Sequence, residues 1–340
     1  MLCHLPRHSP IVLFGAFLAT GCGGPTSPSP LGPTLICPVN LTVQSLDGNA
    51  SPVVYDPPQV VAGEPPLRTR CSPESGANFL LGASTVTCTT TDAAGRTASC
   101  AFTVTLVVPH HIEATSFVAF GNSITEGKQA SGVLAKSYPE NLRELLAARY
   151  SSQTFVVVNA GCGGESTMAG AGPPCIGGVV RLPAVLDTIH PEVLLLEEGI
   201  NDLSGGNPSA IQPLIDAVRS MVREAKTRGI IVFLATFTPV RAGGTPPRGN
   251  GPLPVIPEAN AQIRLLAQSE HATLVDLYEG FGGSPDPYID SDGLHPTEPG
   301  YQKIAQLFFD AIRTRLELPR SATSLVRNMP AQRPPFTRLR

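Results

Sequence analysis

The pattern of apolar and polar positions divides the chain into two regions near residue 108. In the first region, Thr and Val alternate with polar residues at a period of two, and Gly, Pro and Asp turn signals separate the short runs. The clearest runs are residues 40–46, 51–56, 84–92 and 96–108, with a hairpin turn predicted at DAAG, residues 92–95. Because this alternation is typical of half-buried strands, residues 37–108 predict a small all-β domain.

From residue 112 onward, short continuous apolar runs alternate with helical patterns. The runs are SFVAF (116–120), TFVVVNAG (154–161), VLLLEEG (193–199), IIVFLATF (230–237) and TLVDLY (273–278). Such runs are typical of strands buried on both faces of a parallel sheet. Between them, apolar residues recur at intervals of three and four, most clearly from Ser209 to Arg228, which predicts an amphipathic helix. Residues 112–317 therefore predict a three-layer α/β/α domain whose ligand site lies beyond the carboxyl ends of the strands.

Composition narrows the class of partner. The chain of 340 residues has room for both domains, with 42% hydrophobic and 15% charged residues. Its net charge is -3, and no basic stripe interleaves with aromatic residues, so nucleic acid is not expected as a partner. Residues 318–340 contain several arginines and prolines and no acidic residue. This composition predicts a disordered basic tail.

The first 22 residues have the layout of an export signal. Arg7 precedes an apolar run from Ile11 to Leu18, which is shorter than the roughly 20 residues that span a bilayer. The run is followed by Ala-Thr-Gly-Cys, residues 19–22, which resembles a bacterial lipobox in which Cys22 becomes lipidated. We expect a lipoprotein anchored to a membrane through Cys22, with plain secretion as the alternative, and a Gly/Pro/Ser linker over residues 23–36.

The cysteines also indicate export. Apart from Cys3 and Cys22, an even set remains that fits three disulfides in an oxidising compartment, namely Cys37, Cys71, Cys88, Cys100, Cys162 and Cys175. The first four lie in the all-β region, so we expect an immunoglobulin-like sandwich with two disulfides. No Cys-x-x-Cys pair is present, and the adjacent His110 and His111 point apart on an extended chain, so no metal site is expected.

The all-β region resembles the hyalin repeat (HYR) module. The resemblance lies in the opening Cys-Pro at residues 37–38, in the segment CSPESGANFLLGASTVTCTTTDAAGRTASCAFTVT at residues 71–105, and in all four cysteines. Four cysteines allow three pairings. We favour Cys37–Cys100 with Cys71–Cys88, because the first and last strands are neighbours in such sandwiches. Modules of this kind are associated with adhesion or extracellular spacing.

Four polar segments follow strands of the predicted parallel sheet. Ser123 follows the first strand, NAGCGGEST (159–167) the second, EEGINDL (197–203) the third and DSDGLHPTEPGY (290–301) the last. Because the carboxyl ends of parallel strands share one edge, we expect these segments to meet there. Each motif alone is a common turn or capping pattern, but their order after four strands makes coincidence improbable.

This set of residues is sufficient for ester hydrolysis through a serine. The reaction needs a nucleophile, a base, an acid that orients the base, and donors for the oxyanion. Ser123 is the candidate nucleophile, His295 the base, and Asp292, three residues before it, the orienting acid. The candidate oxyanion donors are the backbone N–H groups of Ser123 and Gly164 and the side-chain amide of Asn201, each worth roughly 3 kcal/mol in the transition state.

Residues 112–317 resemble the SGNH hydrolases, the GDSL-type esterases and lipases. The family's four named residues map onto Ser123 in FGNSIT, Gly164 in NAGCGGEST, Asn201 in GIND and His295 in DGLHP, with Asp292 as the acid. The resemblance implies a flavodoxin-like sheet and ester hydrolysis without a cofactor. The sequence departs from the family at Asn122, where Asp is common. A conventional α/β-hydrolase is disfavoured, because Thr125 occupies the last Gly of its Gly-x-Ser-x-Gly elbow.

Several alternatives stay open at this stage. A Cys162–Cys175 bond would either hold the oxyanion donor Gly164 rigidly in place or only stabilise a long surface loop without a role in catalysis. Residues 241–255 form either a lip of the pocket or a disordered insertion. We expect an exported esterase for short acyl or O-acetyl groups, with acetylated polysaccharide as a candidate substrate. The alternative is a surface adhesion or glycan-binding protein with a non-catalytic SGNH-like domain, which the HYR resemblance and Asn122 favour.

Overall fold

The computed structural model describes residues 31–45 and 48–319. The expected signal peptide with Cys22, most of the linker, and the tail beyond residue 319 lie outside the described residues. In the described ranges, no helix combines the length and apolar character needed to cross a membrane. The chain forms two compact units, which are described separately below.

The N-terminal unit is all-β, as predicted. Its strands are β1 (Thr34–Ile36), β2 (Leu41–Gln44), β3 (Ser51–Pro52), β4 (Gln59–Ala62), β5 (Arg68–Ser72), β6 (Asn78–Phe79), β7 (Gly82–Thr91) and β8 (Thr97–Val107). The largest sheet has the order β2-β8-β7-β5, and β1 pairs with β4 and β3 with β6. Strand β1 lies inside the expected linker, so the folded module begins a few residues before Cys37.

Alternation along β7 and β8 places one set of side chains in the core of this unit. Val86, Val104 and Leu106 are buried there, while their neighbours along the strands are more exposed. Two disulfides join the strands, and both are the pairings favoured from the sequence, Cys37–Cys100 and Cys71–Cys88. Cys71 and Cys88 are direct partners in the antiparallel ladder of β5 and β7. The core is thus held by covalent as well as apolar contacts.

The C-terminal unit is the predicted α/β/α sandwich. Its parallel strands are β9 (Ser116–Gly121), β10 (Val156–Gly161), β11 (Val193–Glu197), β12 (Ile231–Ala235) and β13 (Thr273–Val275), in the order β10-β9-β11-β12-β13. This order is that of flavodoxin-like sheets, with the chain reversing direction across the sheet between β9 and β11. Ligands bind such sheets at this switch point.

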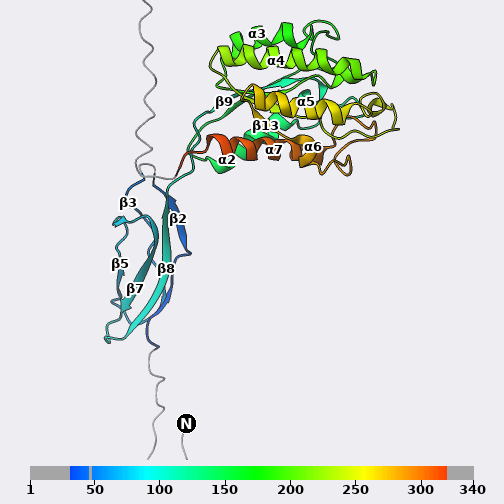
Figure 1. Ribbon diagram of the computed structural model, residues 1–340. Coiled ribbons are helices and arrows are strands. Elements are labelled where there is room, and N and C mark those ends of the chain that lie inside the picture. The colour runs from blue at the N-terminus through cyan, green and yellow to red at the C-terminus, as the bar shows by residue number, and fades with distance from the viewer. Residues whose placement is uncertain (1–30, 46–47, 320–340) are drawn as a thin grey trace, which may run out of the picture. The chain divides into compact units, whose positions relative to one another are not determined.

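Helices cover both faces of the sheet. They are α1 (Ser123–Glu126), α2 (Tyr138–Arg149), α3 (Gly178–Ile189), α4 (Ile211–Thr227), α5 (Ile256–Ser269), α6 (Leu277–Gly280) and α7 (Glu298–Leu316), with short 3₁₀ turns η1 (Ile200–Leu203), η2 (Pro208–Ala210) and η3 (Arg248–Asn250). Figure 1 shows α3, α4 and α5 on one face and α2 and α7 on the other. Helix α4 matches the predicted amphipathic segment, and its apolar stripe, from Leu214 to Ala225, is buried against the sheet.

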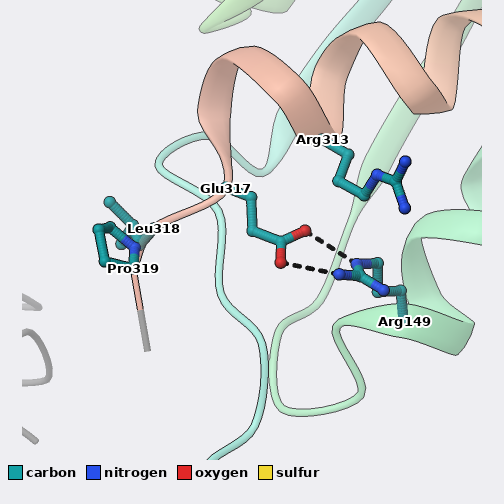
Figure 2. Close-up of a pocket in the computed structure, with 5 residues that line it drawn as sticks. All are labelled: Arg149, Arg313, Glu317, Leu318 and Pro319. Atoms are coloured by element: carbon teal, nitrogen blue, oxygen red, sulfur yellow. Dashed lines mark hydrogen bonds and ion pairs between the residues drawn. The ribbon is translucent and has the colours of Figure 1, made fainter. Parts of the chain in front are cut away.

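The end of α7 is fixed by a polar cluster. Glu317 accepts two hydrogen bonds from the Arg149 guanidinium, both 2.8 Å long, and a third from the Tyr150 hydroxyl at 2.8 Å. Figure 2 shows the paired contacts from Arg149 beside Arg313. A ring nitrogen of His110 lies 2.8 Å from Glu317 as well. These contacts tie the C-terminus of the last helix to α2 and to the start of the unit.

Candidate active site

Ser123 is the first residue of α1 and follows the tight turn that Asn122 makes after β9. Four residues of β9, from Phe117 to Phe120, are fully buried, which fixes the end of the strand within the sheet. Asn122 caps the short helix, because its Oδ1 accepts a hydrogen bond of 2.9 Å from the N–H of Ile124. Only Gly fits at position 121, where a Cβ would collide with the Glu197 carbonyl and the Thr125 hydroxyl. The turn therefore presents Ser123 at the carboxyl edge of the sheet.

Ser123, His295 and Asp292 form a continuous hydrogen-bonded chain. The Ser123 Oγ lies 3.0 Å from Nε2 of His295, and Nδ1 of His295 lies 2.6 Å from Oδ2 of Asp292. An ionised carboxylate can only accept, so Nδ1 carries the proton and Nε2 is free to accept the serine proton. The exposed fraction is 5% for Ser123 and His295 and 0% for Asp292, so solvent does not compete for these contacts.

The local turn holds Asp292 in its ionised form. Its Oδ1 accepts the backbone N–H groups of Leu294 and His295, each at 3.0 Å. Burial opposes ionisation, but the hydrogen bonds from the His295 ring and from these two N–H groups outweigh it and lower the pKa of Asp292. The spacing Asp-x-x-His thus supplies both the charge and its orientation.

The three candidate oxyanion donors lie on the turns that follow β9, β10 and β11. Ser123 is the first residue of α1, and Gly164 has a φ of 80°, which favours glycine. Within the described residues, neither backbone N–H donates a hydrogen bond to the protein. The Asn201 amide donates to the carbonyl of Glu165 at 2.7 Å, which leaves its second N–H available.

Of the groups that hold the Gly164 loop, the sequence indicated the Cys162–Cys175 pair, which forms the expected disulfide, but not the Arg181 contacts. Arg181 of α3 binds both carboxylate oxygens of Glu165 and also donates to the carbonyls of Ala160 and Gly121, at the ends of β10 and β9. The Cys162–Cys175 disulfide closes the same loop. Glu165 lies within the segment NAGCGGEST, but its partner Arg181 lies 16 residues further along, on a helix. No local sequence pattern indicates this pairing.

A second pair of side-chain contacts holds this loop, between Asp202 and Thr167. The carboxylate of Asp202 accepts a hydrogen bond of 2.9 Å from the Thr167 N–H and one of 2.6 Å from the Thr167 hydroxyl. Asp202 directly follows Asn201, so the loop of Gly164 and the turn of Asn201 are joined. The two donors are therefore positioned relative to each other by side-chain contacts as well as by the sheet.

The loop at residues 241–255 lies against the Asp292 turn. Backbone N–H groups of Thr245 and Gly249 donate to the carbonyls of Ser291 and Asp292, each at 3.2 Å. The Nε of Arg248 lies 3.6 Å from Oδ2 of Asp292. The structure therefore favours an ordered element at the edge of the site over a disordered insertion.

Two buried carboxyl groups lie at the end of β11. Burial raises the pKa of Glu197 to about 8, although hydrogen bonds with Thr125 and Asn122 oppose the increase. Burial also raises the pKa of Glu198 well above its ordinary value, and the nearby acids Glu197, Glu165 and Asp202 add to the effect. Neither residue was identified as functional from the sequence, where EE only ends an apolar run.

Two family models match the chain. The model of the GDSL-like lipase/acylhydrolase family matches residues 119–303, which include Ser123, Gly164, Asn201 and His295. The HYR domain model matches residues 30–106, which span all but the last residue of the strands of the all-β unit. Both matches agree with the resemblances found in the sequence, and the earlier start of the HYR match agrees with the position of β1.

Individual relatives support the same assignment. Esterase TesA of Pseudomonas aeruginosa is 28% identical over 173 residues, which are 50% of this chain and 77% of the relative. A multidomain esterase of Ruminococcus flavefaciens is 24% identical over 127 residues, 37% of this chain but only 16% of that protein. A carbohydrate acetylesterase family member from Sinorhizobium meliloti shares the fold, with a TM-score of 0.50 at 17% identity, over 59% of this chain and 98% of the neighbour.

Proposed function

Since the chain belongs to the GDSL-like lipase/acylhydrolase family, we propose that it is an exported serine esterase that releases short acyl or O-acetyl groups. The observation that carries this proposal is the buried chain of hydrogen bonds from Ser123 through His295 to Asp292. A serine aligned on a neutral imidazole, which is itself oriented by a carboxylate, is the arrangement that activates a hydroxyl for attack on an ester.

In the proposed reaction, Ser123 Oγ attacks the ester carbonyl while Nε2 of His295 takes its proton. Asp292 stabilises the imidazolium, and the N–H groups of Ser123 and Gly164 with the Asn201 amide bind the oxyanion. His295 then gives the proton to the leaving alcohol, and an acyl-enzyme remains on Ser123. Water, activated by the same imidazole, attacks the acyl group and releases the acid and the free serine.

Substitution of the nucleophile tests this proposal. Ser123→Ala removes the attacking oxygen, so kcat for p-nitrophenyl acetate should fall by about 10⁴-fold or more. Circular dichroism and thermal unfolding of the variant should match those of the wild type, because the change deletes one oxygen and leaves the Asn122 cap of the turn in place. A rate in Ser123→Ala equal to that of the wild type would exclude the mechanism.

The acyl group is the less constrained part of the proposal. No long apolar lid is evident in the sequence, which favours small acyl groups over lipid chains. The Sinorhizobium neighbour is described as a carbohydrate acetylesterase, which makes acetylated polysaccharide the first substrate to test. We expect kcat/KM to be highest for acetyl esters in a series of p-nitrophenyl esters, and acetate to be released from acetylated xylan or pectin. A maximum at octanoyl or longer esters would contradict the acetyl assignment.

The HYR match and the three disulfides support export to an oxidising compartment. We propose the arrangement of a lipoprotein signal over residues 1–22 with lipidation at Cys22, a linker, the HYR module, the esterase domain and a basic tail. In this arrangement the module holds the esterase away from the membrane.

A binding protein without turnover is the competing function, and Asn122 is the feature that favours it. A fluorophosphonate probe, which reacts only with an activated serine, separates the two. Labelling of Ser123 in the wild type and none in His295→Ala would support the esterase, whereas no labelling of either would support a binding role.

A further inference from the structure

One guanidinium group contacts the segments that carry all three proposed oxyanion donors. Arg181 lies in the first turn of α3, and its side chain has an exposed fraction of 11%. Its Nε lies 2.8 Å from Oε2 and 3.0 Å from Oε1 of Glu165, which is fully buried. The two charges are therefore paired where solvent does not compete. The mechanism proposed above assigns no task to either residue.

The same guanidinium reaches the nucleophile turn. Its Nη2 donates to the carbonyl of Gly121 at 3.2 Å, and its Nη1 donates to the carbonyl of Ala160 at 2.9 Å. Gly121 is the last residue of β9 and lies two residues before Ser123. The guanidinium carbon also lies over the ring of Phe120, 4.0 Å from its centroid. One side chain thus holds the ends of β9 and β10.

Glu165 connects this guanidinium to the other two donors. It directly follows Gly164, whose N–H is one proposed donor, and its carbonyl accepts the side-chain amide of Asn201 at 2.7 Å. Its Oε1 also accepts the N–H of Gly177 at 3.0 Å, next to the start of α3. A displacement of Glu165 would therefore move the Gly164 N–H and the Asn201 amide together.

These contacts depend on the shape of the guanidinium as well as on its charge. Arg carries N–H groups on three nitrogens in one plane, and all three nitrogens of Arg181 donate here. A Lys ammonium is a single nitrogen on a flexible stem. It would replace the charge, but it would not reproduce the bonds to Glu165 and to both carbonyls.

We propose that Arg181 is the positioning residue of the oxyanion hole, because its guanidinium fixes the N–H groups of Ser123 and Gly164 and the Asn201 amide relative to one another. The oxyanion forms only on the way through the transition state. Misplaced donors therefore stabilise it less, whereas binding of the neutral ester changes little. The inference rests on the proposed function, because its readout is the reaction of Ser123.

The first test measures kcat and KM of Arg181→Ala for p-nitrophenyl acetate, in the full chain. Acylation and deacylation both pass through an oxyanion, so kcat should fall about 100-fold while KM changes less than about threefold. Arg181→Lys keeps a cation beside Glu165 and should still lose at least about tenfold in kcat, because the planar set of donors is missing.

Chemical rescue tests the shape of the group directly. Free guanidinium ion has the planar donors of the Arg side chain, and Arg181→Ala leaves space for it. At about 50 mM, far below the molar concentrations that unfold proteins, guanidinium chloride should raise kcat of Arg181→Ala about tenfold, and methylammonium chloride should not. Equal effects of the two ions, including no effect of either, would overturn the proposal.

Arg264 provides a matched control for the loss of an Arg–carboxylate pair. It joins α5 to the carboxylate of Asp276, which directly follows β13, through bonds of 2.7 and 3.0 Å. Two strands separate β13 from β9 in the sheet. Arg264→Ala should therefore lower the unfolding temperature but leave kcat within about threefold of the wild type.

A double variant separates the loss of positioning from the loss of stability. Arg181→Ala leaves a buried carboxylate unpaired, which destabilises the fold. In Arg181→Ala/Glu165→Gln both charges are gone and the Gln oxygen can accept the Gly177 N–H, so this variant should fold and keep the loss of kcat.

Wild-type kcat in Arg181→Lys or in the double variant would overturn the proposal, as would an equal loss of kcat in Arg264→Ala. Activity that survives in Ser123→Ala would instead refute the proposed function, so the two failures are distinguishable.

Discussion

The oxygens of Asp292 divide two tasks between them. Oδ1 accepts two backbone N–H groups of its own turn, and Oδ2 accepts the proton on Nδ1 of His295. An Asn at this position would still accept the backbone N–H groups of the turn through its amide oxygen. Its NH2 group would donate to Nδ1 of His295, so the ring proton would move to Nε2, which could then no longer accept the proton of Ser123. We therefore expect Asp292→Asn to lower kcat about 10³- to 10⁴-fold with little change in KM.

The neighbouring Asp290 offers a matched control for this prediction. Its carboxylate accepts the N–H groups of Ala130 at 3.0 Å and Ser291 at 2.6 Å but does not contact His295. Asp290→Asn should change kcat less than about threefold, because an amide oxygen can replace one acceptor. Comparable losses in steady-state kcat for the two variants would show that Asp292 acts only on the turn.

Among individual residues, those in short motifs beyond the strands could be predicted from the sequence, whereas the residues that support them could not. Ser123, Gly164 and Asn201 lie within a few residues of a strand end, where parallel topology brings such motifs together. His295 lies further on, beyond β13 and α6, and was found through its Asp-x-x-His motif. Arg181 acts from a helix, through contacts with Glu165 and with the carbonyls of Ala160 and Gly121. Such contacts join residues that are distant in the sequence, so they form only when the strands and helices have packed together.

Among the secondary-structure elements, α7 depends on the polar cluster at its end. The hydrogen bonds from Arg149 lower the pKa of Glu317 to about 2, with Tyr150 and His110 contributing and burial opposing. Because the folded pKa is below the unfolded value of 4.5, the cluster adds stability above about pH 4.5 and loses it as pH falls toward 2. Glu317→Gln should therefore reduce the free energy of unfolding at neutral pH by about 1–3 kcal/mol.

Urea unfolding at pH 7 and near pH 3 measures this effect. The difference between the wild type and Glu317→Gln should be smaller at the lower pH, because the wild-type carboxylate has begun to lose its advantage. Glu258→Gln, which changes an exposed carboxylate on α5, should leave stability within about 0.5 kcal/mol at both pH values. An equal difference for Glu317→Gln at both pH values would contradict the assignment.

Element positions agreed with the prediction where the sequence has a continuous apolar run or a long helical period. The strands β9 to β13 and helix α4 lie within a few residues of their predicted ranges. The expectation of burial on both faces was wrong for β10, which lies at the edge of the sheet and is only half-buried. The strands β1, β4, β5 and β6 were not identified, since these short segments form neither a continuous apolar run bounded by turn signals nor a sustained alternation. In these segments, pairing with a neighbouring strand decides the structure.

At the scale of the whole molecule, each unit buries its own core. The cluster centred on Phe117, Leu195 and Phe233 belongs to the α/β unit, and β8 of the other unit ends at Val107. We expect residues 109–340 to fold alone and to hydrolyse p-nitrophenyl acetate with kcat/KM within about threefold of the full chain. A chain starting at Ala114 removes the buried Ile112 as well as the contact of His110 with Glu317, so it should unfold at a lower temperature. Loss of kcat in the 109–340 fragment would show that the two units share the catalytic task.

The order of the catalytic groups along the chain has a consequence for biosynthesis. Ser123 and His295 are 172 residues apart, and His295 immediately precedes the last helix, whose end must also dock. At about 5–20 residues per second, a ribosome produces the nucleophile about 10 to 30 s before the base. A growing or prematurely terminated chain therefore carries a serine that cannot be activated. In the proposed mechanism, hydrolysis begins only after the chain through the last helix has been made and folded, which would spare the esters of the cell that makes it.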